Sequence, residues 1–483
     1  MTERSPQDTA REIEGYLKDN QLYYGSEPRN NGDASWTLAL NNHTVTPEQE
    51  SSLQTSFPEF IDTFHRGSAR LMHSALTAGN TSNPPLDRLR RYLTMGVPEE
   101  TQELWQQAAR NGQEVFSSRP DMIVDPQGKF HIVEYNTDGG ADKGNTQGIN
   151  DYSRMFLGKE TLGANLAKTF VNSIRQKYND RDTVTVATVL PDNYRQEYDA
   201  QNRYFANQAQ RYGSELGVRW ITMRVSDVHI DDSKVYAVLD GNKHTLDVLD
   251  REFKLPGFMP EVNFEREVEL VRAALEGRVE MLGSILPFQD KVLLSTLFDK
   301  DYSSAYDEDN LPAVRQVHAE TAIVNRDQPN IQLGGNALTL DDIYGLRPDF
   351  SMVLKRGGDT VGSTGSKGLV ISEDVSPDAW KKELDRALTE PLSGGNFWVV
   401  QRFYQSKRFP VRHIRNSRSQ YKELQVINRF APYYVRGQEG FRLGNILVTA
   451  GTDEETYKRH KNNVHGLRQN TYQAVSLNGK NNT

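Results

Sequence analysis

The sequence contains no cysteine in its 483 residues. That absence excludes disulfides, thiolate nucleophiles and thiolate metal sites. The ten histidines form no HExxH or similar pair, which argues against a zinc site. No stretch approaches the ~20 consecutive apolar residues that a membrane-spanning helix needs. The formal net charge of -8 gives no basic footprint for nucleic acid. We therefore expect neither nucleic acid nor a membrane among the partners.

The beginning of the chain, MTERSPQDTAREIEGY, is polar and charged and lacks the apolar core of a signal peptide. A reducing cytoplasm is the simplest location for a chain without cysteine, so we expect a cytoplasmic protein. The length suits one large multilobed enzyme or two to three ordinary domains. The sequence does not indicate an oligomeric state.

Apolar spacing and turn residues divide the chain into five expected regions. Residues 1–115 are expected to be mainly helical, and residues 116–180 to form a hairpin and a following helix. Residues 181–285 show a strand–helix–strand order that predicts a small parallel sheet with helical cover. Residues 286–410 hold a glycine-rich loop between strands, and residues 411–475 are expected to be antiparallel strands. The expected fold class is therefore mixed, with α+β and α/β parts.

Residues 119–140, RPDMIVDPQGKFHIVEYNTDGG, combine the chemistry of a hairpin with charged ends. Because residues two apart on a strand share a face, Arg119 lies beside Asp121, and Glu134 beside Asn136. Two carboxylates and a carboxamide oxygen are hard ligands that suit Mg²⁺. An arginine beside them could hold a phosphoryl group or a substrate carboxylate. The alternative is an exposed hairpin end with surface ion pairs.

A second stretch, VLKRGGDTVGSTGSKGLVI (353–371), places Lys355 at the end of a strand before a glycine-rich loop. Glycines let backbone N–H groups approach an anion, and the lysine adds a point charge. The loop is neither a Walker A motif nor a dinucleotide fingerprint, because no helix follows it. The alternative is a mobile surface hairpin with a solvated lysine.

The strand WVVQRFY lies downstream of the loop and presents Gln401, followed by Arg402, Phe403 and Tyr404. Such a strand can line an adenine slot, in which backbone groups read the purine edge and apolar side chains cover its face. A plain core strand is the alternative reading.

Together these motifs resemble the ATP-grasp ligases. Their order, with the metal residues first, resembles the circularly permuted branch, and in detail the synthetase domain of the glutathionylspermidine synthetase family. Members carry R-x-D, E-x-N, a lysine that begins a helix, and a lysine before a glycine loop. This chain has RPD, VEYN, DKVLLSTLFD and LKRGG in that order, within residues 115–450. The resemblance implies a permuted ATP-grasp fold. Residues 116–180 and 411–475 would form its core, 286–410 its lid subdomain, and 181–285 a small substrate-side domain.

The resemblance also implies an ATP-dependent carboxylate–amine ligase. It would make an amide or peptide bond through an acyl phosphate and release ADP and phosphate. Asp121, Glu134 and Asn136 would hold one or two Mg²⁺ ions, and Arg119 would neutralise the carboxylate or the γ-phosphoryl group. The second catalytic arginine would be Arg442, with Arg436 as the other candidate. The residues implied in ATP binding are Lys291, Lys355, Gly357, Gly358, Gly362, Ser363, Thr364, Gly365, Gln401, Arg402, Phe403 and Tyr404.

Several features depart from the family. Lys355 is followed by Arg356 where the family usually has proline, and the 315–345 region carries an apparent insertion of unassigned role. The segment after E-x-N is replaced by TDGGADKGNTQG, and the amidase domain that often precedes the synthetase is missing. The residues implied in nucleotide binding therefore match the family better than those implied in substrate binding. Neither glutathione nor a polyamine is implied as substrate.

The partners are expected to be a small-molecule or peptide carboxylate and an amine. The segment TDGGADKGNTQG, beside the metal residues, could bind either group. A pair of residues at a strand end in the α/β unit is a second candidate. The alternative is that the segment is only a loop, as stretches rich in Gly, Asn and Asp usually are. These substrate candidates are Asp138, Asp142, Lys143, Arg251 and Glu252. A phosphotransferase on the same fold and a non-catalytic nucleotide-binding protein stay open as alternatives.

Overall fold

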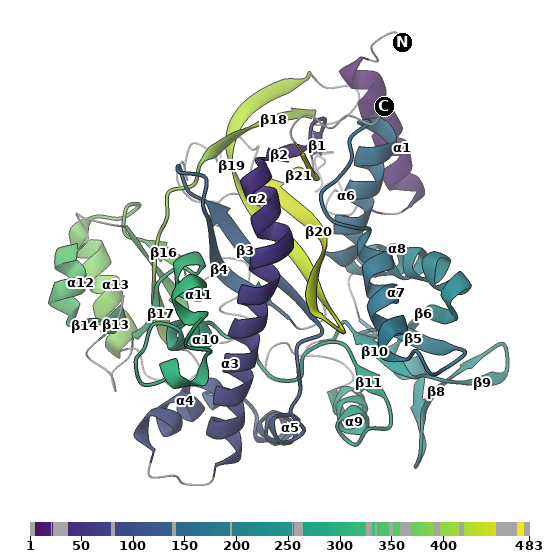
Figure 1. Ribbon diagram of the computed structural model, residues 1–483, viewed down its shortest axis with the longest axis horizontal. Coiled ribbons are helices and arrows are strands. Elements are labelled where there is room, and N and C mark those ends of the chain that lie inside the picture. Colours follow the sequence, from purple (N-terminus) through teal and green to yellow (C-terminus); the bar gives the residue numbers. More distant parts are fainter. Residues whose placement is uncertain are drawn as a thin grey trace.

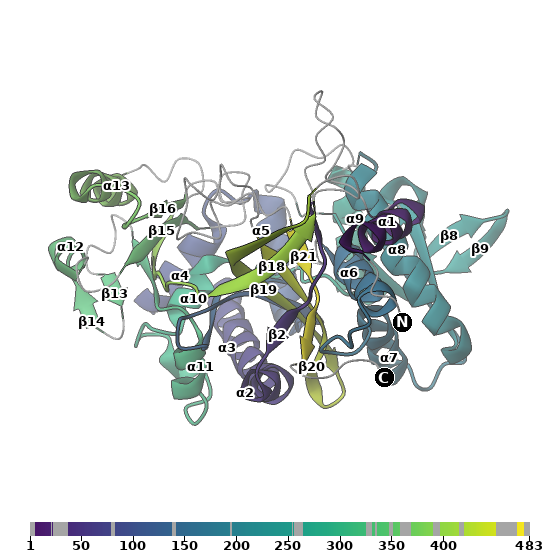
Figure 2. The same cartoon turned by 90° about the horizontal axis from the view of Figure 1, so that it is seen from above.

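The structure of the protein is a computed structural model. It describes residues 5–20, 22, 37–78, 83–137, 142–193, 196–253, 255, 264–324, 331–333, 336–346, 351–357, 369–389, 397–414, 420–450 and 471–477. Within these residues three larger sheets lie side by side, and a long helix, α3 (Phe57–Thr77), crosses the middle one (Figures 1 and 2). The fold is mixed α/β with both antiparallel and parallel sheets.

The middle sheet has seven strands in the described residues, in the order β18-β1-β21-β20-β19-β3-β4. It is antiparallel except where β1 pairs with β21. Segments far apart in the sequence therefore meet in one sheet, and the N-terminal region, expected to be mainly helical, contributes a strand to it. The strands are β18 (Arg408–Ile414), β1 (Thr37–Ala39), β21 (Thr471–Gln473), β20 (Gly440–Ala450), β19 (Lys422–Gly437), β3 (Ser117–Val124) and β4 (Phe130–Asn136).

A four-stranded parallel sheet, in the order β11-β10-β5-β6, forms one flank of the molecule, as the strand–helix–strand pattern predicts. The β-branched run of β5 is almost entirely buried, which is typical of a strand covered on both faces. The strands are β11 (Glu280–Met281), β10 (Val248–Arg251), β5 (Val184–Leu190) and β6 (Val218–Arg224). The helices of this flank are α6 (Lys143–Phe156), α7 (Leu166–Lys177), α8 (Gln196–Gly213) and α9 (Phe264–Leu275).

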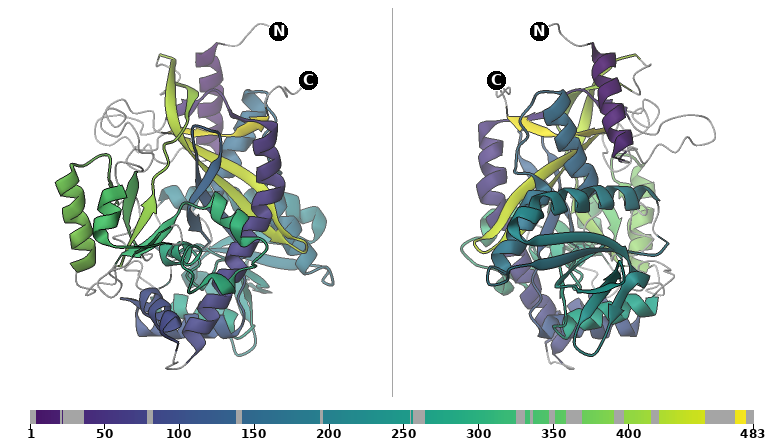
Figure 3. Two further views of the ribbon diagram at one scale, coloured as in Figure 1. Left: turned by 60° about the vertical axis from the view of Figure 1, so that its left-hand side comes forward. Right: turned by 90° about the vertical axis from the view of Figure 1, so that its right-hand side faces the viewer.

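A four-stranded antiparallel sheet, in the order β12-β17-β15-β16, forms the opposite flank (Figure 3). One face of it packs on α13 through an apolar core that includes Leu354, Trp380, Trp398 and Val400. The other face turns Lys355 and its neighbours towards β4. The elements here are β12 (Thr321–Val324), β17 (Trp398–Arg402), β15 (Met352–Arg356), β16 (Leu369–Ile371), α10 (Lys291–Thr296), α11 (Leu311–Val317), α12 (Leu340–Leu346) and α13 (Pro377–Thr389).

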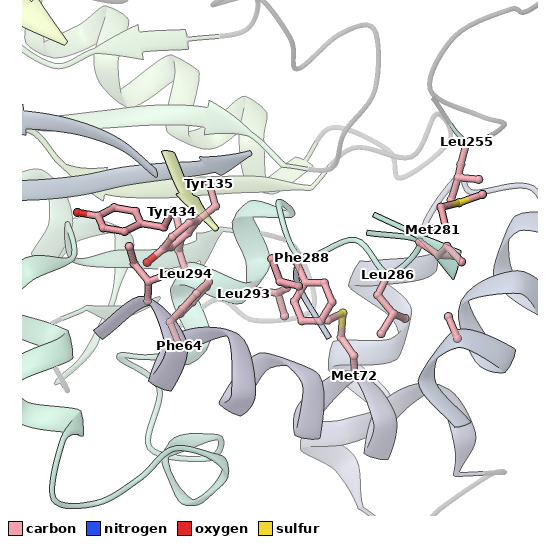
Figure 4. Close-up of a cluster of buried hydrophobic side chains, with 14 of the residues drawn as sticks. Phe64, Met72, Tyr135, Leu255, Met281, Leu286, Phe288, Leu293, Leu294 and Tyr434 are labelled. Carbon is pink, nitrogen blue, oxygen red and sulfur yellow. The ribbon is translucent and has the colours of Figure 1, made fainter. Parts of the chain in front are cut away.

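Helix α3 holds the middle sheet to the N-terminal helices. Its buried face follows a helical repeat of apolar residues, and the ring of Phe64 stacks on Tyr135 of β4 with the centroids 4.6 Å apart. Figure 4 shows these two side chains together, with Tyr434 beside them. The position of β4 is thus fixed by the main core of the protein. The other N-terminal helices are α1 (Pro6–Asp19), α2 (Pro47–Ser51), α4 (Pro84–Thr94) and α5 (Glu99–Arg110).

Three small sheets complete the described part of the chain. One is a hairpin of β13 and β14 in the apparent insertion, and it packs with α12 on the flank of β15. Among the described helices, none is both long enough and apolar enough to cross a bilayer. The small-sheet strands are β13 (Ile331–Leu333), β14 (Asn336–Leu338), β2 (His43–Val45), β22 (Val475–Leu477), β7 (Val228–Ile230), β8 (Val235–Leu239) and β9 (Asn242–Thr245).

Candidate functional site

The open end of the β3–β4 hairpin brings four polar side chains together. The antiparallel register sets Asp121 opposite Glu134, and Arg119 opposite Asn136. Directly opposed residues lie on the same face of a sheet and close to each other. The register shifts between Asp121 and Met122, and such a bulge re-aims the side chains beside it. The four residues predicted from the sequence therefore form one group.

Asp121 is buried between two arginines. Its Oδ2 accepts a hydrogen bond from Nη1 of Arg429 at 3.0 Å, and its Oδ1 lies 3.7 Å from Nε of Arg119. Among the described residues, Oδ1 receives no hydrogen bond. A buried carboxylate oxygen is costly to leave without a donor or a cation. This oxygen is therefore suited to a ligand or a metal ion.

Arg119 links the hairpin to the loop that follows it. The residue is only 6% exposed. Its Nη1 lies 3.2 Å from Oδ2 of Asp142 and 3.5 Å from the hydroxyl of Tyr433. The guanidinium also lies 5.7 Å from the centre of the Tyr433 ring. Its orientation is therefore set from three sides, by Asp121, Asp142 and Tyr433.

Lys291 approaches the hairpin from α10, where it is the first helical residue. The N-cap residue Asp290 accepts a hydrogen bond from the backbone N–H of Val292, which fixes the start of this short helix. Nζ of Lys291 lies 3.4 Å from Oε1 of Glu134. The lysine is 7% exposed, so its charge is largely withdrawn from water.

Lys355 approaches the same carboxylate from the sheet on the other side. Its Nζ donates to Oε1 of Gln401 at 2.6 Å and to the carbonyl oxygen of Val133 at 3.4 Å. Burial lowers the pKa of Lys355 to about 8, Glu134 opposes this change, and Lys291 adds to it. A buried lysine whose pKa is lowered by a second lysine needs an anion to hold its charge.

The whole group carries more positive than negative charge. Because most of these side chains are buried, solvent screens the excess only weakly. Such a group is suited to a polyanionic ligand. The cations are Arg119, Arg429, Lys291 and Lys355, and the carboxylates are Asp121, Glu134 and Asp142.

The chemistry of the predicted metal residues suits magnesium. The described residues contain no set of three or more His, Asp or Glu placed to hold a metal ion. The predicted set instead combines the carboxylates of Asp121 and Glu134 with the amide of Asn136. Nδ2 of Asn136 donates to the carbonyl oxygen of Arg119 at 3.3 Å, which leaves the amide oxygen as the ligand atom. Three oxygens of this kind suit a Mg²⁺ ion that takes its other ligands from phosphates and water.

Among the residues predicted for an adenine slot, Gln401 is tied directly to the lysine. It is 2% exposed, and its Nε2 donates to Oγ1 of Thr321 at 2.8 Å and to the carbonyl oxygen of Val133 at 3.3 Å. The ring of Tyr404 stacks on His131 of β4, with the centroids 3.7 Å apart. Tyr404 therefore packs against the hairpin, while Gln401 orients Lys355.

Arg402 and Phe403 lie at the end of the same strand. Arg402 is at 5.1 Å from the centre of the Tyr404 ring, and its Nη1 lies 3.7 Å from Glu320. The backbone N–H of Phe403 donates to the carbonyl oxygen of Ser351. Both residues are half-buried, and these contacts attach the end of β17 to its neighbours.

The glycine-rich loop enters the described residues only at its start. The backbone N–H of Gly357 donates to the carbonyl oxygen of Phe397 at 2.7 Å. A Cβ atom at Gly357 would collide with the Phe397 ring, so this position requires glycine. The other residues predicted to bind ATP in this loop lie outside the described residues: Gly358, Gly362, Ser363, Thr364 and Gly365.

The arginine that meets the hairpin from the C-terminal strands is Arg429, which the sequence reasoning missed. Arg442, predicted for this place, pairs with Glu439 at 2.7 Å on the same hairpin turn, and its side chain is 49% exposed. Arg436, the other candidate, pairs with Asp62 at 2.7 Å. Neither contact involves β4 or the carboxylates of the site. A signal for Arg429 existed, because INRFAPYYV is a largely apolar strand with one charged residue near its start.

The predicted substrate residues separate into different environments. Asp138 lies outside the described residues, and Asp142 pairs with Arg119. Lys143 is fully buried, with Nζ 2.6 Å from Oε1 of Glu252. Arg251 is also buried, and it donates to the backbone carbonyls of Phe253 and Ser284. Lys143 and Glu252 thus belong to one internal ion cluster rather than to an open binding surface.

Comparisons with known proteins show a related fold among the solved structures. No protein-family model matches the chain, and no curated protein matches it. Among solved structures, a glutathione synthetase-like effector from Globodera pallida, in its apo form, matches with a TM-score of 0.57. The match covers 98% of each chain at 12% sequence identity. The fold is related to that of a glutathione synthetase-like protein. At this identity the match shows the fold alone.

Proposed function

We propose that this protein is an ATP-dependent carboxylate–amine ligase on a circularly permuted ATP-grasp fold. It would form an amide or peptide bond and release ADP and phosphate. The observation that carries the proposal is the approach of two buried lysines to β4, where Nζ of Lys291 lies 3.4 Å from Oε1 of Glu134 and Nζ of Lys355 donates to the carbonyl oxygen of Val133. The full-length similarity to a glutathione synthetase-like structure supports the fold part of the proposal.

Each side of the site has a distinct role in this proposal. ATP would supply the phosphoryl group that activates the carboxylate. Lys291 and Lys355 would hold its phosphates, and Asp121, Glu134 and Asn136 would hold one or two Mg²⁺ ions. The excess positive charge of the site supports the binding of phosphates, and Oδ1 of Asp121, which receives no hydrogen bond from the described residues, supports the binding of a metal ion. The glycine-rich loop keeps its predicted role as a phosphate contact.

Two arginines would neutralise the charge of the reacting groups. Arg119 and Arg429 both contact Asp121, and both are largely buried, so their charges act in a medium of low dielectric constant. Preorganised charges of this kind stabilise a transferring phosphoryl group without rearrangement of solvent. We therefore assign the role of the second catalytic arginine to Arg429 in place of Arg442.

The substrates in this proposal are a small-molecule or peptide carboxylate and an amine, in a cytoplasmic setting. A screen of acids against amines, with release of ADP as the signal, tests the proposal directly. Wild-type protein should release ADP with at least one pair, and Lys291→Ala and Lys355→Ala should each weaken ATP binding by about 1.5–3 kcal/mol. Wild-type ATP affinity in both lysine variants would refute the site. ADP release with one stable phosphorylated acid and no amide would identify a phosphotransferase.

A further inference from the structure

Lys143 is a fully buried lysine that the proposed reaction does not use. Its Nζ lies 2.7 Å and 2.8 Å from the two carboxylate oxygens of Asp250, and 2.6 Å from Oε1 of Glu252. The rings of Phe170 and Phe205 lie within 5.6 Å and 5.3 Å of the ammonium nitrogen. A buried ion cluster contributes little to stability, because desolvation offsets the attraction of the charges. Its presence therefore points to a role in positioning.

Both carboxylates are anchored at the ends of parallel strands. Oγ1 of Thr188, on β5, donates to Oδ2 of Asp250 at 2.9 Å. Oγ1 of Thr188 in turn accepts a hydrogen bond from Nε1 of Trp220. The backbone N–H of Glu252 donates to the carbonyl oxygen of Val189 at 3.0 Å. Burial raises the pKa of Glu252 to about 8, and Lys143 opposes this change. Asp250 contacts the ammonium group through both of its carboxylate oxygens, whereas Glu252 contacts it through one.

The helix that carries Lys143 begins against local preference. A lysine in the first turn of a helix opposes the helix dipole. Asp142, the N-cap residue, has a left-handed backbone (φ 78°), which is uncommon outside glycine. A Cβ atom at Gly144 would collide with the carbonyl oxygen of Gln201, so α6 also approaches α8 closely. Several local rules broken at one place commonly mark a functional constraint.

The side chain of Asp142 serves the proposed active site instead of capping its own helix. The side chain of an N-cap aspartate ordinarily accepts a hydrogen bond from a backbone N–H of the first turn, yet among the described residues no backbone N–H donates to the carboxylate of Asp142. Its Oδ1 accepts from the side-chain Nδ2 of Asn145 at 3.4 Å. Its Oδ2 lies 3.2 Å from Nη1 of Arg119 instead. Lys143 of the internal ion cluster thus directly follows, in the chain, the carboxylate that holds the arginine of the hairpin.

We propose that Lys143 and Asp250 are positioning residues, which fix the start of α6 on the parallel sheet so that Asp142 holds Arg119 in place. The inference rests on the proposed function for its catalytic consequence. It also links the parallel sheet to the hairpin through the start of α6. Neither Lys143 nor Asp250 would touch ATP or the metal, so their loss should leave nucleotide binding intact.

The test compares three variants with the wild-type chain. Lys143→Met/Asp250→Asn removes one charge of each sign, Asp250→Asn alone is a milder change that keeps the lysine, and Lys168→Met is a control at an exposed lysine of α7. The double variant should lower kcat by about tenfold and change the ATP Kd by less than about twofold. Asp250→Asn should lower kcat by less, and Lys168→Met should change neither. Wild-type kcat in both Asp250 variants would overturn the proposal.

A second measurement separates this inference from the proposed function. The NMR signal of the Nε–H group of Arg119, identified by its loss in Arg119→Lys, reports the arginine without any turnover. The signal should move in Asp250→Asn and further in the double variant, and should stay in place in Lys168→Met. An unmoved signal in both Asp250 variants refutes the positioning role, even when the enzyme is active. A shifted signal in a protein that never binds ATP would keep the positioning role and reject the proposed function.

Discussion

The affinity for ATP should depend on pH through Lys355. This lysine is 4% exposed, and burial lowers its pKa from 10.5 to about 8. The difference of about 2.5 units corresponds to roughly 3 kcal/mol of destabilisation of the ammonium in the free protein. A bound triphosphate beside Nζ should remove most of that cost, because an adjacent anion favours the charged form.

The direction of the effect follows from linkage. Binding raises the pKa of Lys355, so ATP binds best when this lysine is protonated, below about pH 8. Above that pH the affinity should fall up to tenfold per unit, until the pH reaches the pKa of the complex. Between about pH 7.5 and about pH 9.0, the Kd should rise by roughly eightfold. Phosphate groups are already ionised over this range, so the nucleotide itself contributes little.

Calorimetric titration of ATP into wild-type and Lys355→Arg protein measures this dependence. The arginine stays charged at every pH of the series, so the Kd of the variant should be nearly constant. Glu252, which also has a pKa of about 8, is present in both proteins and controls for titration elsewhere. A wild-type Kd that is flat over this range, or an equal slope in Lys355→Arg, would refute the reasoning.

Three further predictions concern the metal, the second arginine and the core. Glu134→Gln keeps the shape of a side chain that lies 3.4 Å from Lys291 but removes its charge. The variant should lose Mg²⁺-dependent turnover while ATP binding is weakened less, and activity at ordinary Mg²⁺ would contradict the metal role of Glu134. Arg429→Gln should lower kcat by about a hundredfold while Arg442→Gln leaves it unchanged, and the reverse order would restore Arg442 to the site. Burial lowers the pKa of His318 from 6.5 to about 4, so stability should be lost as pH falls through this window, by about 3 kcal/mol in full. Urea unfolding at neutral and acid pH should show that the stability of His318→Gln depends less on pH than that of the wild type. An equal pH dependence in the two proteins would contradict this role of His318.

The sequence predicted the hairpin and its four polar residues because strand geometry is local. Alternation places side chains on a face, so Arg119 could be grouped with Asp121, and Glu134 with Asn136. The register set by the turn would place Asp121 opposite Val133, and the bulge between Asp121 and Met122 brings Glu134 opposite Asp121 instead. The parallel sheet in residues 181–285 could also be predicted, because the order strand–helix–strand is a local pattern. The convergence of Lys291 and Lys355 on the hairpin needed the resemblance to a known family, because nothing local brings these elements together.

The choice among the arginines shows where such reasoning ends. Arg429 lies on β19, which pairs with β3, whereas Arg442 lies on β20, which β19 separates from β3. The strand order of the folded sheet therefore decides which arginine reaches Asp121. The ion cluster of Lys143 was equally hidden, because its acidic partners lie about a hundred residues away in the chain. A loop rich in Gly, Asn and Asp gave no sign that its lysine would be fully buried.

Identification of the nucleotide products tests the central claim most directly. With the correct acid and with hydroxylamine in place of the amine, wild-type protein should release ADP and phosphate and form one hydroxamate per ADP. This outcome follows if the lysines hold the inner phosphates and the metal residues present the terminal phosphorus to the carboxylate. The same mixture with Glu134→Gln should yield almost none of these products. Stoichiometric AMP and pyrophosphate would contradict the account, because that enzyme would have to expose the α-phosphorus instead.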